Sequence, residues 1–377
     1  MSKIVIATVG ILGVLSAAEA ASQLTRALRS HDRSYQNDEI VQFPLVDGGE
    51  GTIDFLVSHT LGSFLEVETV DARGTEAIIP IGFASEDGKL AIIEMKRVAG
   101  VLADGDHGTT YGIGELIRDA LDEGAFSVLL GLDEPLACDA GLGAVAALGV
   151  KFFDEKDRLL DMNIAQPPIN KIARVDASGR NFQLLSSRFF IASTQRALQT
   201  APSTMLMGEL ERLSGIIQRD CDIHANAHAL TGSAAAFGLR SFLGAEVQDG
   251  TSLILDAALV EENITQTNIL LIFANNFEQL DELFLRRFLD AAIKHGKQVI
   301  LLFANLQNSS SLTKQGYSKD AIHSLSDIQL FQQPLRADAT ADEIRRDLFM
   351  RIEKIIPALS AKMSRSESLG NLTAATS

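Results

Sequence analysis

The segment Val46–Thr52 (VDGGEGT) places two carboxylates and three glycines directly after an apolar stretch of the chain. The carboxylates of Asp47 and Glu50 are able to bind hydroxyl groups or a metal ion. The glycines let the backbone approach a small anion closely; they are Gly48, Gly49 and Gly51. We interpret the segment either as a binding turn for a small polar ligand or as a tight turn with solvated carboxylates.

A second segment, Thr109–Leu121 (TTYGIGELIRDAL), has the pattern of a glycine-containing entry into an amphipathic helix. The elements that must position these two segments depend on the chain as a whole. Of its 377 residues 46% are hydrophobic and 22% are charged, which is typical of a globular protein with two domains.

The composition argues against several classes of partner. The formal net charge is −16, and a phosphate backbone would repel so acidic a protein, so we expect no nucleic-acid partner. A local pocket for a small anion is still allowed. No apolar run approaches the ~20 residues of a membrane span, so we expect no membrane contact. The chain has only two cysteines, Cys138 and Cys221, which fits a reducing compartment and a cytoplasmic protein.

The N-terminal residues allow two interpretations. A lysine followed by the apolar run Ile4–Leu15 and by a triplet of small residues imitates a signal peptide. Alternatively, Lys3–Thr8 is a buried strand, followed by a glycine-containing loop and a helix. Ser16 and Glu19 have the spacing of a capping box, which favours the strand, the loop and the helix.

Strand and helix patterns alternate at both ends of the chain, and the middle has several short strands. At the ends we predict strands at Ile4–Ala7, Glu39–Pro44, Asn268–Ala274, Lys297–Phe303 and Ile328–Gln332, and helices at Ser16–Arg29, Thr52–Thr60, Glu278–His295 and Thr340–Met363. In the middle we predict strands at Phe64–Ala72, Ala77–Phe83, Lys89–Met95, Ser127–Gly131, Val150–Phe153 and Arg188–Ser193, and helices at Ile113–Asp122 and Gly141–Leu148.

These patterns predict an α/β fold. Residues 1–62 and 263–363 form a discontinuous, doubly wound parallel-sheet domain of the Rossmann or flavodoxin-like type. Residues 63–262 form an inserted domain of mixed α/β structure. Residues 364–377 are small and polar, and we expect a disordered tail there.

Several segments follow one another in the order found in the bacterial glycerate kinase (glycerate 2-kinase) family. They are Lys3–Ala7 with Leu15–Ala17, the VDGGEG turn, Glu94–Met95, the TTYGIGELIRDAL segment, Ala147–Asp154 (ALGVKFFD) and Leu243–Glu246 (LGAE). The sequence therefore resembles this family over nearly its whole length. The resemblance implies the split domain described above, ATP-dependent phosphorylation of glycerate, and Mg²⁺ and ATP as cofactors. It implies a small hydroxy acid such as glycerate as the ligand, and it allows a homodimer.

The candidate site residues combine this resemblance with residue types. Candidate catalytic residues are Asp47, Asp139 and Glu278; candidate substrate-binding residues are Asp47, Gly48, Gly49, Glu50 and Gly51; candidate nucleotide-binding residues are Gly10, Gly13, Gly141 and Arg196. No set of metal ligands is identified. His224 and His228 have the spacing of a metal-binding pair on a helix, but they fall in an expected connecting loop, where an exposed or satisfied pair is the alternative.

At several positions where the resembled family has charged or glycine residues, this chain has other types. The family's first-loop aspartate and lysine correspond to Val9 and Leu12, and its phosphate-loop glycine pair corresponds to Asp133 and Glu134. Losing one preorganised partner of a transition state costs about 3–4 kcal/mol, or roughly 10²–10³ in rate.

Three hypotheses follow from these departures. The first is a diverged member, a pseudoenzyme with reduced or lost catalysis and a ligand-binding or regulatory role. The alternative is an active hydroxy-acid kinase with rearranged catalytic groups, drawn from Asp139, Glu278, Arg196 and Lys96. The third is a structural or partner-binding protein with a closed cleft. The sequence alone leaves the question of enzymatic activity open.

Overall fold

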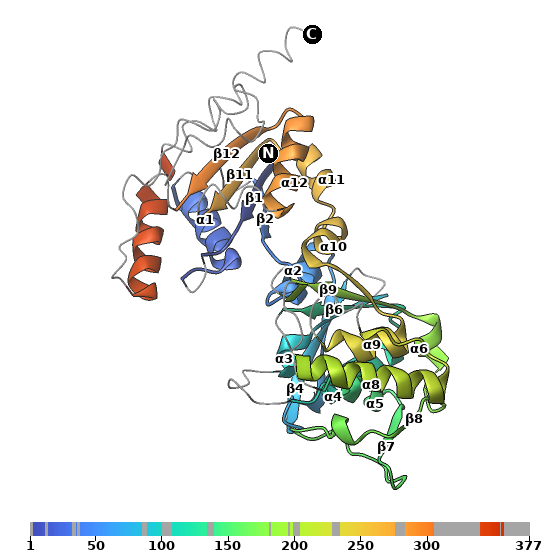
Figure 1. Ribbon diagram of the computed structural model, residues 1–377. Helices are drawn as coiled ribbons and strands as arrows, with labels where there is room; N and C mark the ends of the chain where they lie inside the picture. The colour runs from blue at the N-terminus through green and yellow to red at the C-terminus, as the bar shows by residue number, and fades with distance from the viewer. Residues whose placement is uncertain are drawn as a thin grey trace. The chain divides into compact units, whose positions relative to one another are not determined.

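The computed structural model describes residues 3–11, 14–31, 35, 38–84, 89–99, 108–133, 139–180, 182–194, 197–198, 204–227, 234–275, 283–304, 340–354 and 356–357. The chain divides into two compact units, which are labelled by element in Figure 1. The first unit combines Met1–Leu45 with Leu259–Ser377, and the second is Val46–Ala258. The predicted boundary at residue 62 differs from this division, because the helix that follows the VDGGEGT segment packs on strands of the second unit.

The first unit has a four-stranded sheet in which all strands are parallel, in the order β12-β11-β1-β2. Its strands are β1 (Lys3–Thr8), β2 (Glu39–Pro44), β11 (Ile269–Ala274) and β12 (Gln298–Phe303). Its helices are α1 (Ala17–His31), α11 (Val260–Gln266), α12 (Leu283–Lys294) and a helix over residues 341–354.

Helices cover both faces of this sheet. On one face, Leu24 of α1 and Leu348 of the last described helix share a core with Ile4 and Ile6 of β1. The side chain of Phe43 on β2 lies on the other face of the sheet. Phe43 pairs in register with Ala7, whose side chain points away from the face of Ile4 and Ile6. Its ring meets that of Phe288 on α12, with centroids 5.2 Å apart. The doubly wound parallel sheet predicted from the sequence is therefore confirmed.

The N-terminal strand, loop and helix are also confirmed. Glu19 Oε2 accepts a hydrogen bond of 2.9 Å from the backbone N–H of Ser16. Ser16 Oγ accepts one of 3.2 Å from the backbone N–H of Glu19. This reciprocal pair satisfies donors that the first turn of α1 leaves without helical partners. The predicted strand Ile328–Gln332, the start of the predicted helix at Glu278 and the expected tail 364–377 lie outside the described residues.

The second unit has a six-stranded mixed sheet in the order β10-β9-β6-β5-β4-β3. Its strands are β3 (Ser63–Val70), β4 (Glu76–Ala84), β5 (Leu90–Glu94), β6 (Ser127–Leu132), β9 (Arg188–Ser193) and β10 (Glu246–Asp249), and β7 (Lys151–Phe153) pairs separately with β8 (Arg174–Asp176). The pairs β3–β4 and β4–β5 are antiparallel, whereas β5, β6, β9 and β10 run parallel. The predicted mixed α/β character of this region is confirmed.

Eight α-helices are described in the second unit, together with a short 3₁₀ helix at Ile169–Lys171. They are α2 (Thr52–His59), α3 (Met95–Ala99), α4 (Tyr111–Asp122), α5 (Leu142–Ala147), α6 (Phe182–Ser186), α8 (Thr204–Cys221), α9 (Ala236–Leu243) and α10 (Gly250–Ala257). The apolar stripe of α4 packs on one face of the sheet, where Ile113 and Ile117 share a core with Val128 and Ile191.

Helix α2 packs on the other face of β4. Ile81 and Phe83 point into the α4 core, so Gly82 between them faces the opposite side. A Cβ at Gly82 would come within 2.7 Å of Ile53 and 2.8 Å of Val57, both on α2. The missing side chain lets α2 lie close against the sheet, and this contact places the turn before α2.

Two further observations concern the predicted histidine pair and the helix lengths. Helix α8 ends at Cys221, and His224 lies exposed in the irregular segment that follows. His224 therefore lies outside a helix, and His228 lies outside the described residues. None of the helices in the described part of the chain is sufficiently long and apolar to span a bilayer.

Candidate functional site

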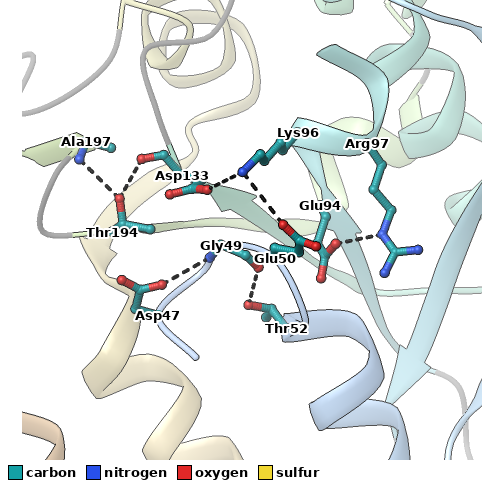
Figure 2. Close-up of polar contacts among 10 residues, drawn as sticks. All are labelled: Asp47, Gly49, Glu50, Thr52, Glu94, Lys96, Arg97, Asp133, Thr194 and Ala197. Atoms are coloured by element: carbon teal, nitrogen blue, oxygen red, sulfur yellow. Dashed lines mark hydrogen bonds and ion pairs between the residues drawn. The ribbon is translucent and has the colours of Figure 1, made fainter. Parts of the chain in front are cut away.

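The segment 47–51 forms a turn at the carboxyl ends of the parallel strands of the second unit. Strand β5 ends at Glu94, β6 is followed by Asp133 and β9 is followed by Thr194, and these residues surround the turn (Figure 2). Carboxyl ends of parallel strands are the usual location of ligand sites in open α/β sheets. The turn predicted from glycine and carboxylate spacing is therefore in a position suited to binding.

Close backbone contacts fix this turn on three sides. Gly48 has φ +99°, and a Cβ there would lie 2.1 Å from the carbonyl oxygen of Ala192 at the end of β9. A Cβ at Gly131 of β6 would lie 2.3 Å from the carbonyl oxygen of Gly48. A Cβ at Gly250, where α10 begins, would lie 1.8 Å from the carbonyl oxygen of Asp47. Because side chains are excluded at these contacts, the turn has little freedom to move.

Asp47 is half-buried within a group of carboxylates. Burial is the main cause that raises the pKa of Asp47, and the charges of Asp133 and Asp249 raise it further. A hydrogen bond of 3.3 Å from the Gly49 N–H to Asp47 Oδ1 acts in the opposite direction. A carboxylate whose pKa is raised is a stronger base, which suits it to accept a proton or a hydroxyl hydrogen bond.

Lys96, on α3, supplies a cation at the turn. Its ammonium lies 3.1 Å from Asp133 Oδ2 and 3.8 Å from Glu50 Oε2 (Figure 2). Its side chain is 44% exposed, so the ion pairs are solvated and the ammonium can be reached from solution. The sequence had indicated Lys96 only as one alternative group for a rearranged kinase site.

A buried carboxylate links the start of α2 to α3. Glu94 is 3% exposed, and its Oε1 accepts a hydrogen bond of 3.0 Å from the Ile53 N–H in the first turn of α2. Its Oε2 accepts one of 2.6 Å from Arg97 Nε, and Arg97 also pairs with Asp54 at 3.0 Å. Glu94 therefore stabilises the helix start that follows the turn.

Asp139, a predicted catalytic residue, is buried in a structural setting. It is 1% exposed. Its oxygens accept hydrogen bonds from the Thr110 N–H and Oγ1, at 2.7 and 2.9 Å, and from the N–H groups of Gly141 and Gly143, at 3.0 and 3.1 Å. Asp139 thus joins the start of α4 to the start of α5. Four donors around a buried carboxylate fit a structural role better than the catalytic role expected from the sequence.

Gly141, a predicted nucleotide-binding residue, is part of the same structure. Its N–H is donated to Asp139, and a Cβ at Gly141 would lie 2.2 Å from the carbonyl oxygen of Ala235. Its backbone is therefore packed closely against that of Ala235.

The titration of Asp139 leads to a testable pH dependence. Burial raises the pKa of Asp139 from 3.8 to about 6, against the effect of its hydrogen bonds. The folded state therefore holds this proton more tightly than the unfolded state, and stability from this group is present at low pH and lost as pH rises from about 4 to about 6. Asp139→Asn removes the titration. We expect the stability advantage of the wild type over this variant to shrink by about 2 kcal/mol across that window.

Urea unfolding of both proteins at pH 4.5, 5.5 and 7 measures this change. Asp122→Asn, a substitution on the exposed end of α4, is the control and should show the same pH profile as the wild type. A constant difference between the wild type and Asp139→Asn at all three pH values would contradict the prediction.

The remaining predicted nucleotide contacts are in the first unit or outside the described residues. Gly10 directly precedes Ile11, which exchanges backbone hydrogen bonds of 2.7 and 3.0 Å with Leu15. Val9 and Ile11, on either side of Gly10, are buried, at 4% and 8% exposure. Gly13 and Arg196 lie outside the described residues, as does Glu278, which was predicted to be catalytic.

The described residues supply few of the groups that hold a nucleotide and its Mg²⁺. Within the described parts of the chain, no group of three or more histidine, cysteine, aspartate or glutamate side chains is arranged to hold a metal ion. Asp133 and Asp47 add negative charge beside the turn, which opposes a polyphosphate. The Gly141 N–H, a donor that could have cradled a phosphate, is taken by Asp139.

Comparison with known proteins identifies the family. The model of the glycerate kinase family matches residues 4–197. The chain is 28% identical to glycerate 2-kinase of Escherichia coli (strain K12) over 291 residues, which cover 70% of this chain and 74% of the relative. It is 36% identical to glycerate kinase of Bacillus cereus (strain ATCC 10987 / NRS 248) over 169 residues, which cover 42% of each chain.

The fold agrees with this comparison. A crystal structure of a protein described as glycerate kinase 2, from Salmonella typhimurium LT2, matches with a TM-score of 0.69 at 23% identity. The match covers 96% of this chain and 99% of the other. At this identity the likeness concerns the fold, whereas the family model rests on the sequence over half of the chain. The protein therefore belongs to the glycerate kinase family.

Proposed function

We propose that the turn Asp47–Gly51 binds a small hydroxy acid such as glycerate, and that phosphoryl transfer from ATP is reduced or lost. The observation that carries the proposal is the contrast between two groups of residues. The turn and its carboxylate are rigidly held at the strand ends, whereas Asp139 and Gly141, which were expected to serve catalysis and the nucleotide, bind each other.

The turn offers groups suited to both parts of a hydroxy acid. Asp47 is half-buried, and its carboxylate accepts hydrogen bonds, which suits the hydroxyl groups of glycerate. The ammonium of Lys96 is close to the turn and partly exposed, which suits the carboxylate of the ligand. The relatives named above are described as glycerate kinases, which supports the choice of glycerate among hydroxy acids.

Phosphoryl transfer needs cations or Mg²⁺ around the phosphates and backbone donors to cradle them. In the first loop Val9 and Ile11 are apolar and buried, and neither type can balance a phosphate charge. At the end of β6, Asp133 adds a negative charge. Each missing partner costs roughly 10²–10³ in rate, so the combined effect lowers turnover strongly.

Calorimetric titration with D-glycerate and, separately, with Mg·ATP tests the binding part. We expect glycerate to bind and Asp47→Asn to weaken it by about 10–100-fold, since hydrogen bonds to a charged group contribute about 1.5–3 kcal/mol. The matched control is Asp122→Asn, which removes one exposed carboxylate elsewhere and should bind like the wild type. Absence of any heat with glycerate would refute the proposal.

A coupled assay for ADP, with D-glycerate, Mg²⁺ and ATP, tests the catalytic part. We expect no turnover in the usual enzyme range of about 1–10³ s⁻¹. The alternative is an active kinase with rearranged groups, and the position of Lys96 beside the turn favours it. Turnover in that range, abolished by Lys96→Ala and unaffected by Asp122→Asn, would establish this alternative.

A further inference from the structure

Asp133 is held in a defined position at the end of β6. Thr194, directly after β9, donates its Oγ1 hydrogen to the Asp133 carbonyl oxygen at 2.6 Å. The Thr194 N–H donates to the Leu132 carbonyl at 2.9 Å. Thr194 is 3% exposed, so these bonds are shielded from water. The backbone that carries the Asp133 side chain is therefore fixed by two adjacent strands.

The carboxylate of Asp133 lies directly against the glycine turn. A Cβ at Gly49 would come within 3.2 Å of Asp133 Cγ and 3.4 Å of its Oδ1. The absence of a side chain at Gly49 therefore gives room to this carboxylate. In Figure 2 the Asp133 side chain is directed toward Lys96, and the two form the ion pair of 3.1 Å.

A ligand carboxylate at the turn would need the same surroundings. A bound carboxylate is stabilised by backbone without a side chain, which a small anion can approach closely, and by a nearby cation. Gly49 and Lys96 supply both, and the Asp133 carboxylate already lies against each of them. A second anion at this place would meet the charge of Asp133 at short range and would have to share Lys96 with it.

We propose that Asp133 is a specificity-determining residue. Its carboxylate competes with a ligand carboxylate for Lys96 and for the space beside Gly49, and it therefore lowers the affinity of the turn for anionic ligands. The proposal rests on the proposed function to the extent that the turn binds small ligands. The proposal predicts different effects of Asp133 on the hydroxyl groups and on the carboxylate of such a ligand. Ligand hydroxyl groups are bound through Asp47, so Asp133 does not weaken their binding. The binding of a ligand carboxylate is weakened by the negative charge of Asp133.

The test compares the binding of glycerate and of glycerol, a neutral analogue, to the wild type and to Asp133→Asn. The substitution keeps the shape of the side chain and removes its charge. We expect the dissociation constant for glycerate to fall about tenfold, as for the loss of one repulsive charge in a partly solvated site. The affinity for glycerol should change less than twofold. Lys96→Gln in the Asp133→Asn background should remove the gain.

Asp122→Asn is the control for net charge, because it removes a distant, exposed carboxylate and should leave both affinities unchanged. Equal glycerate affinity in the wild type and Asp133→Asn would overturn the inference while leaving the proposed function intact. Glycerate binding to Asp133→Asn alone would support the inference and refute the proposed function for the wild type. A parallel rise in glycerol affinity would also overturn the inference, since it would indicate a structural change in place of charge competition.

Discussion

Gly48→Ala is expected to lower the free energy of unfolding by about 4 kcal/mol or more, a large effect for one added methyl group. The added Cβ would lie 2.1 Å from the carbonyl oxygen of Ala192, where backbone is the obstacle. The backbone at Gly48 also has φ +99°, which strains any residue with a side chain by about 1–3 kcal/mol. Overpacking adds about 1–3 kcal/mol or more, because the turn is fixed between strands and cannot shift away.

Gly124→Ala is the matched control for this prediction. Gly124 has a similar backbone, with φ +96°, but a Cβ there would have no heavy atom within 4 Å. This variant should show the backbone strain alone, about 1–2 kcal/mol. Urea unfolding followed by circular dichroism compares the two. If both variants lose the same free energy of unfolding, the turn shifts to make room for the added methyl group, which would contradict the prediction.

Glu94→Ala is expected to lower the free energy of unfolding by about 2–4 kcal/mol, the second large effect, because two hydrogen bonds to a buried carboxylate are lost. The substitution removes the buried carboxylate that accepts a hydrogen bond of 2.6 Å from Arg97, and it leaves the partly exposed guanidinium with Asp54 as a carboxylate partner. The variant also deprives the Ile53 N–H of its acceptor at the start of α2. Because α2 follows directly from the turn, glycerate binding should weaken together with stability.

Asp54→Asn separates the buried partner of Arg97 from the exposed one. Asp54 pairs with the same guanidinium at 3.0 Å, but its side chain is 64% exposed. Exposed ion pairs contribute little, so this variant should lose less than about 1 kcal/mol. Thermal unfolding of the two variants side by side is the measurement. A cost for Asp54→Asn as large as that for Glu94→Ala would contradict the assignment of the buried pair.

Much of the fold was predictable because local patterns matched the final structure. The predicted strands Glu39–Pro44 and Arg188–Ser193 coincide with β2 and β9. The capping box at Ser16 marked the start of α1. These elements depend on residues close in sequence, so spacing and composition were sufficient to find them.

Other elements were missed although a signal was present. Helix α8 has apolar residues at Leu206, Leu210, Leu213 and Ile217, the spacing of a helix face packed on a core. We nevertheless predicted no helix there from the sequence. The division at Leu45 was not predicted either, because it depends on the packing of α2 on β4 through Gly82, a contact between distant segments.

The candidate site shows the same limit more sharply. The sequence by itself determined the turn Asp47–Gly51, the alternation of strands and helices, and the family to which the chain is similar. Only the tertiary structure decided what each carboxylate does. Asp47 and Asp139 both precede glycines in loops after strands. Asp47 lies half-buried near the charges of Asp133 and Asp249, whereas Asp139 is buried among four donors. The charge and the freedom of an ionisable group depend on neighbours brought from far along the chain, and these are set by packing and not by local spacing.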